Sequence, residues 1–251
     1  MAKLEAKQIQ INGVEDMANY FHSVRDFFIH KAPCLTFDNF FINAILVRAH
    51  QINKGFLELT NSGNFLCAAP LVRMQVETLC RLYGGYIADS DNYIPKFMKG
   101  EKVDNLTARG RKLSYTTLVI YLAEDLGLAE LPRIYEEGNS FIHPTDVAFK
   151  ASIWNEDRKV TIQNLEGRLY EDSEMEAIKN DMLYVNLCFH KVIYMYQMAF
   201  LEFVNATSDT ANNPPVQVTD PEEIDKFKDK IEGFLDNIKR DTGSSEEVCG
   251  K

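Results

Sequence analysis

The segment from Glu171 to about Asn205 has apolar residues around most of its circumference when it is wound as a helix, above all in its second half. A helix that is apolar on nearly every side has to be covered by other elements. The preceding chain supplies such elements, because apolar residues recur there at spacings of three and four, the period of an amphipathic helix. The sequence therefore predicts an all-α helical bundle around the 171–205 helix, with further helices at residues 14–31, 36–61, 67–88, 115–126 and 129–142.

Capping residues place several of the helix ends. Thr36 and Ser114 each precede an apolar periodic segment, and both residue types accept hydrogen bonds from the free N–H groups of a first helical turn. Gly127 supplies a C-terminal stop, since glycine readily adopts the left-handed conformation that ends many helices. His143 precedes Pro144, and a residue before proline avoids the α region, so the 129–142 helix is expected to end there.

Two parts of the chain depart from the helical pattern. Residues 150–163 hold two β-favouring runs around a polar stretch, which favours one small β-hairpin. Residues 206–219, which include Asn212-Asn213-Pro214-Pro215, are typical of a linker. We therefore expect a core domain of residues 1–205, the linker, and an acidic amphipathic helix and tail at 220–251. The apolar stripe of residues 220–240 needs a partner surface, in the same chain or in a second protein.

Charge and cysteine content limit the function classes. The net charge is -10, and residues 206–251 carry eleven acidic and six basic side chains, a net of -5. This balance argues against broad electrostatic capture of nucleic acid or anionic lipid. The five cysteines are odd in number and far apart, which indicates buried thiols in a reducing compartment. We expect a cytoplasmic protein, because the first ten residues lack an apolar signal core and no apolar run approaches a membrane span.

A polar row on the 67–88 helix is the first candidate site. Arg73, Glu77 and Arg81 fall within roughly an 80° arc of the helix, taking about 100° per residue. Two guanidinium groups held by one carboxylate can bind a phosphate or carboxylate ligand. Gly84-Gly85 nearby would allow close approach of another backbone. The alternative is a solvated face with two ordinary helical ion pairs.

The end of the 129–142 helix is the second candidate site. Tyr135, Asn139 and His143 are spaced by four, and Glu136 and Ser140 lie beside them, so polar groups gather near one face. A histidine there can act as an acid or base near neutral pH. The alternative is a helix C-terminus at which the imidazole interacts with the helix dipole.

A polar stripe also interrupts the apolar 171–205 helix, at Asn186, His190 and Gln197. Buried polar groups need partners, because an unpaired one costs about 1 to 3 kcal/mol. We interpret this stripe as an internal hydrogen-bond network that fixes helix register; the alternative is that it completes a site with His143. The chain has no motif typical of a metal site, a Walker loop or a dinucleotide turn, so we expect no metal and no cofactor.

The segment from Gly138 to Pro144 resembles the late-helix motif of the HEPN superfamily, usually Arg-Asn, three further residues and His. Asn139 and His143 match its spacing. The resemblance implies an all-helical and commonly dimeric protein, and many members are metal-independent endoribonucleases of toxin and phage-defence systems. In these nucleases the arginine and histidine of both protomers meet across the dimer.

A closer resemblance, over roughly residues 37–205, is to an uncharacterised bacterial HEPN-related helical family with R-x-x-x-E and S-x-x-H-P motifs. Here the first motif is Arg73 to Glu77 and the second is Ser140 to Pro144, after Tyr135. Gly138 occupies the position at which a HEPN nuclease carries its arginine. If catalysis occurs, Arg73 or Arg81 has to supply that charge from a facing helix.

These observations lead to two function hypotheses. The first is a HEPN-like homodimer with an RNA- or nucleotide-related role, as a metal-independent ribonuclease. In it His143, Asn139 and Arg73 are catalytic, and the residues Glu77, Arg81, Ser140 and Tyr135 bind the ligand. The second is a non-catalytic helical module that binds a small anionic ligand, or a protein partner through residues 220–240.

Overall fold

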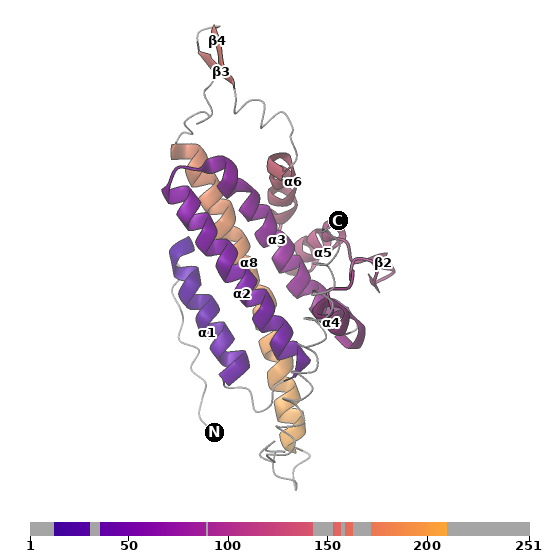
Figure 1. Ribbon diagram of the computed structural model, residues 1–251. Helices are drawn as coiled ribbons and strands as arrows, with labels where there is room; N and C mark the ends of the chain where they lie inside the picture. The colour runs from indigo at the N-terminus through magenta and orange to yellow at the C-terminus, as the bar shows by residue number, and fades with distance from the viewer. Residues whose placement is uncertain are drawn as a thin grey trace, which may run out of the picture. The chain divides into compact units, whose positions relative to one another are not determined.

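The computed structural model describes residues 13–30, 36–88, 90–142, 153–156, 159–162 and 172–209. Contacts divide the chain into two units, Met1–Ala199 and Phe200–Lys251, each considered by itself. The all-α prediction is confirmed, since the described residues are almost entirely helical (Figure 1). The predicted linker starts at residue 206, whereas the last helix continues to Asp209. The rest of the linker and the expected 220–251 helix and tail lie outside the described residues.

Four long helices and three shorter ones make up most of the described chain. The long helices are α1 (Met17–His30), α2 (Phe37–Asn61), α3 (Phe65–Ile87) and α8 (Asp172–Asp209), and a 3-10 turn, η1 (Val14–Asp16), precedes α1. The shorter helices are α4 (Ser90–Met98), α5 (Tyr115–Leu126) and α6 (Leu131–Ile142). Helix α2 packs against α1 and α3, and α3 packs in turn against α5 and α6 (Figure 1).

Predicted caps agree with the structure at α5. The Ser114 hydroxyl accepts a hydrogen bond from the Thr117 N–H at 3.3 Å, and Gly127 ends the helix with a φ of 64°. Helix α3 begins earlier than the sequence suggests, because the Asn64 side chain caps it by accepting from the Cys67 N–H. Pro70 therefore lies inside α3, beyond its first turn.

A buried polar network ties α8 to α2 and α3, as predicted for Asn186. The Asn186 side chain accepts a hydrogen bond from Gln75 at 2.8 Å and donates one to Asn53 at 2.7 Å. Asn53 in turn donates to the Val14 carbonyl at 3.0 Å. All three amide side chains are buried, so the network fixes the register of three helices. His190 does not join it, since its ring bonds to the Tyr20 hydroxyl at 3.0 Å.

Aromatic side chains occupy the space beside the paired glycines of α3. A Cβ on Gly84 would lie 2.7 Å from the Tyr93 hydroxyl, and one on Gly85 would lie 2.6 Å from the Phe41 ring. We expected these glycines to admit another backbone, but the structure places the rings of α4 and α2 there. The glycines thus serve core packing rather than a ligand site.

Two short antiparallel ladders are present in the described residues. The predicted hairpin is β3 (Ile153–Glu156) with β4 (Lys159–Ile162), paired from Ile153 opposite Ile162. The other ladder, β1 (Thr107–Ala108) with β2 (Arg111–Lys112), was not predicted. Arg109 and Gly110 join its strands with φ values of 53° and 75°, the positive angles that a tight hairpin turn requires.

Within the described ranges, no helix combines the length and the apolar character that crossing a membrane demands.

Candidate functional site

Arg73 of α3 lies over Tyr135 of α6. Its Nη2 is 3.1 Å from a Glu77 carboxylate oxygen and 3.4 Å from the Tyr135 hydroxyl oxygen, to which it donates. The guanidinium carbon is 4.9 Å from the centre of the Tyr135 ring, within cation–π range. The Arg73 side chain is only 13% exposed. The structure therefore brings together three of the predicted site residues, from two helices.

The Arg73 stem crosses α6 at Gly138. A Cβ built on Gly138 would lie 2.6 Å from the Arg73 Cβ, closer than two such atoms can come. Because the Arg73 Cβ is bonded to the helix backbone, it cannot rotate away, so any side chain at 138 would push the helices apart. Glycine is thus required at position 138, and the guanidinium of Arg73 from α3 lies against α6.

Arg73 also has an unused donor. Its Nε is buried and has no hydrogen-bond partner among the described residues. Both contacts described above run through Nη2, on one edge of the guanidinium plane. An unpaired buried N–H of a charged group is costly, although the burial of this atom keeps a ligand oxygen from reaching it in this structure.

Arg81 belongs to a different cluster. It pairs with Asp104 at 2.5 Å, donates from Nε to the Tyr115 hydroxyl at 3.1 Å, and lies 4.2 Å from the centre of that ring. We expected Glu77 to hold both guanidinium groups, but its ion pair is with Arg73. Arg81 instead joins α3 to α5 and to the segment after α4, which is a structural role.

The polar residues at the end of α6 are held locally. The Asn139 amide donates to the Glu136 carboxylate at 3.4 Å, and the Ser140 hydroxyl donates to the Glu137 carbonyl at 2.6 Å. Both side chains are half-buried and lie within two turns of Tyr135. His143, the predicted acid or base, lies outside the described residues, as does Pro144.

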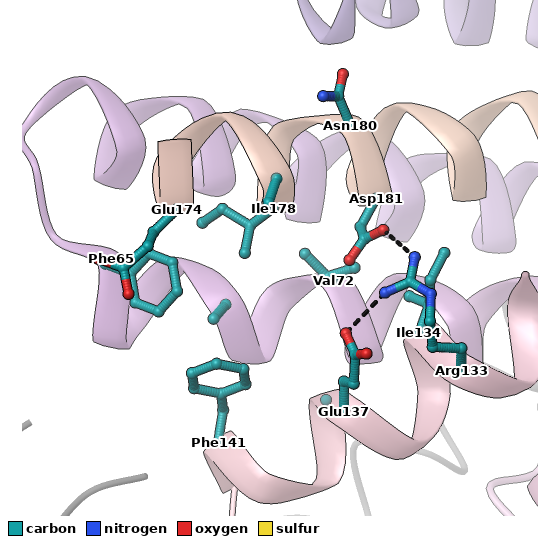
Figure 2. A pocket seen from close by; sticks show the side chains of 13 residues that line it. Phe65, Val72, Arg133, Ile134, Glu137, Phe141, Glu174, Ile178, Asn180 and Asp181 are labelled. Carbon is teal, nitrogen blue, oxygen red and sulfur yellow. Dashed lines mark hydrogen bonds and ion pairs between the residues drawn. The ribbon is translucent and has the colours of Figure 1, made fainter. Parts of the chain in front are cut away.

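A cleft of about 410 Å³ opens on Gly138 from a side that sequence reasoning missed (Figure 2). It lies between the start of α3, α6 and the start of α8, with Phe65 and Phe141 in edge-to-face contact on its wall. Arg133 pairs with Glu137 of its own helix and reaches across the cleft to Asp181 of α8, at 2.7 Å each (Figure 2). Neither Arg73 nor any ligand residue predicted from sequence lines this cleft.

Arg133 forms three ion pairs beside that cleft. Besides its two contacts there, it pairs with Glu130 at 3.0 Å, and all three carboxylates together leave the rim negative. The spacing of Glu130, Arg133 and Glu137 is a sequence signal for helical ion pairs. The Asp181 partner carries no such signal, because it comes from a distant helix. The cleft is therefore unsuited to an anionic ligand.

Cysteine chemistry has little support in the described residues. Cys80 and Cys188 are buried, and burial raises the pKa of the Cys188 thiol to about 12 and that of Cys80 further, so neither ionises near neutral pH. Cys67 is exposed, which corrects the expectation that it is buried. No group of three or more His, Cys, Asp or Glu that could hold a metal ion occurs among the residues that the structure describes.

No family model matches the chain, and no curated protein or solved structure does either.

Proposed function

We propose that this chain is a HEPN-like helical protein with an RNA- or nucleotide-related function. The site of that function is the contact of Arg73 with α6, together with Asn139, Ser140 and His143. One observation carries the proposal: the Arg73 stem fills the space at Gly138 and its guanidinium lies against Tyr135. The charge that a HEPN motif places on its late helix is thereby supplied from the facing helix.

The catalytic form of the proposal is metal-independent cleavage of RNA. The His143 imidazole takes the proton of a ribose 2′-hydroxyl, whose oxygen then attacks the adjacent phosphorus and displaces the 5′-oxygen of the next nucleotide. Asn139 orients the hydroxyl. Arg73 stabilises the negative charge that develops on the phosphate oxygens.

Glu77 and Tyr135 have supporting roles in this scheme. Glu77 holds the guanidinium from one edge, and the Tyr135 ring supports its face, so Arg73 loses little rotamer freedom when a phosphate binds. We further propose a cytoplasmic homodimer of the bacterial defence or toxin type, in which the α6 ends of both protomers contribute to one site.

The test is incubation of purified protein with mixed RNA in the presence of EDTA. We expect wild-type protein to cleave RNA, and both His143→Ala and Arg73→Lys to cleave at least 100-fold more slowly. Arg73→Lys keeps the positive charge but loses the planar set of guanidinium donors. We use it because it should disturb folding less than Arg73→Ala. Arg111→Ala, at an exposed arginine of β2, is the control and should cleave like wild type. Equal product yields from wild type and His143→Ala would exclude this mechanism.

A second candidate is a non-catalytic module that binds a small anionic ligand. It is favoured by the engagement of Arg73 with Glu77, which holds the guanidinium in place but reduces the positive charge available to a transition state. In that case Arg73→Lys weakens a nucleotide-induced rise in melting temperature, while no RNA is cut by any variant. Partner capture through residues 220–240 would instead be lost on deletion of residues 208–251, without loss of nucleotide binding.

A further inference from the structure

A second cavity, of about 300 Å³, lies between α1 and α2, away from Arg73. Phe21, Leu46 and Val47 form its apolar wall. The remaining lining residues all carry nitrogen donors, and they are His22, Arg25, His50 and Gln51. Neither carboxylate nor hydroxyl side chains line the cavity. Its polar surface therefore matches a ligand that accepts hydrogen bonds.

Two imidazole rings meet in this cavity. The His22 and His50 ring centres are 5.1 Å apart in an edge-to-face arrangement, although the residues belong to different helices. His50 Nδ1 is buried and has no hydrogen-bond partner in the described part of the chain. A buried ring nitrogen of this kind normally has a hydrogen-bond partner, and the unpaired one here belongs to a residue that lines the cavity.

Two cations lie beside the His pair. Arg25 of α1 lines the cavity, and its Nε donates to Asn43 of α2 at 3.0 Å, which restrains the guanidinium. Lys54 of α2 adds a charge close to His50. The carboxylates that offset these cations, Asp26 and Glu58, are exposed and lie 4.0 Å from them, at the limit of an ion pair.

The same charges act on His50 itself. Burial, the neighbouring His22 and Lys54 together lower the pKa of His50 below its usual value near 6.5. The imidazole is thus neutral at neutral pH, and its protonation is opposed mainly by burial and by nearby positive charge. A bound anion would favour the protonated ring and so would offset the effect of His22 and Lys54 on the pKa of His50.

We propose that the α1–α2 cavity binds a small oxyanion, a phosphate or sulfate group, between His22, Arg25 and His50, and that a proton is taken up at His50 on binding. A divalent metal ion is the less suitable ligand, because only two imidazoles are at hand and the cations Arg25 and Lys54 would repel it. This site is independent of the function proposed for Arg73, since the two share no residue.

Anion affinity should depend on pH in one direction. Proton uptake by His50 accompanies anion binding, so affinity rises as the pH falls. The charged side chains beside the pair are Arg25 and Lys54, with their ion-pair partners Asp26 on α1 and Glu58 on α2. Sulfate keeps its charge between pH 6.0 and 7.5. With one proton taken up throughout that range of 1.5 pH units, the affinity for sulfate should rise by up to about thirtyfold.

The experiment follows the histidine ring signals of the full chain by NMR during titration with sulfate at pH 6.0 and 7.5. We expect sulfate to shift the His22 and His50 signals, with tighter binding at pH 6.0. His50→Gln should weaken binding at least fivefold and remove its pH dependence. His190→Gln, whose ring contacts Tyr20 rather than the cavity, is the control and should bind as wild type.

Titrations with AMP and with inorganic phosphate show whether the bound oxyanion is part of a nucleotide or free phosphate. Tighter binding of AMP than of inorganic phosphate, at one pH, would support the proposal and assign the phosphate to a nucleotide; equal binding would support it with free phosphate as ligand. Three results would overturn the proposal: ring signals unmoved by sulfate at pH 6.0, unchanged binding in a folded His50→Gln variant, or shifts induced by zinc ions and not by any anion. Because Arg73→Lys leaves this cavity intact, the ring shifts should persist there even if RNA cleavage fails.

Discussion

Replacing Gly138 by alanine tests the closeness of α3 and α6. The new Cβ would lie 2.6 Å from the Arg73 Cβ, and neither atom can move without its helix. Forcing extra methyl groups into a packed contact costs about 1 to 3 kcal/mol. Alanine also favours a helix by about 0.5 to 1 kcal/mol relative to glycine, which offsets part of that cost.

Gly55→Ala separates the two contributions. Gly55 lies in α2, and a Cβ there would meet only the Leu71 side chain, at an ordinary contact distance of 3.6 Å. Both variants gain the same helix preference, so the difference between them measures the clash alone. We expect Gly138→Ala to be less stable than Gly55→Ala by about 1 to 3 kcal/mol.

Urea unfolding followed by circular dichroism at 222 nm measures this difference, provided that both variants unfold with the slope of wild type. Gly55→Ala should be at least as stable as wild type. If Gly138→Ala matched Gly55→Ala in stability, α3 and α6 would be further apart than described, and the reason given for glycine at position 138 would be wrong.

Three further outcomes follow from described contacts. Asn186→Leu leaves the buried amides of Gln75 and Asn53 without their hydrogen-bond partner. It should lower the free energy of unfolding, measured with urea, by at least about 2 kcal/mol. Asp125 of α5 accepts hydrogen bonds from Arg109, at 2.9 Å, and from the Tyr83 hydroxyl, and these hold the pKa of its carboxyl below the usual value. Asp125→Asn should therefore destabilise the protein at pH 7 and lose that effect as the pH falls below about 3.8. In the folded protein a thiol reagent should label Cys67 and spare Cys80 and Cys188, as read by peptide mass spectrometry.

For each of these three predictions, a specific result would contradict it. Wild-type stability of Asn186→Leu would show that the network is not formed. The sign for Asp125 follows from its lowered pKa: the stabilisation is complete above the unfolded pKa and is lost as the pH falls through the folded one, so a constant difference down to pH 2 would contradict it. Labelling of Cys80 as fast as of Cys67 would place it at the surface.

Local signals in the sequence were enough to place helices and their ends. Ser114 and Gly127 bound α5 because a cap and a stop act on the neighbouring backbone alone. Asn186 could be predicted as part of an internal network because a polar residue on an apolar helix needs a partner. Its partners could not be named, since they come from helices more than one hundred residues away.

The spacing of apolar residues does not predict which residues of different helices come into contact. A helical pattern gives the face on which Arg81 lies, but not that Asp104 and Tyr115 meet it there. The same holds for His22 and His50, which form a cavity only once α1 packs on α2. Gly138 is the clearest case, because its role depends on the depth at which two helices cross.

Binding of a short single-stranded RNA, measured by fluorescence anisotropy at low salt, tests the role of Arg73 most directly. We expect wild type and Arg111→Ala to bind alike and folded Arg73→Lys to bind at least tenfold more weakly, a loss of about 1.4 kcal/mol. Equal affinities in all three proteins, or no binding by wild type, would contradict it.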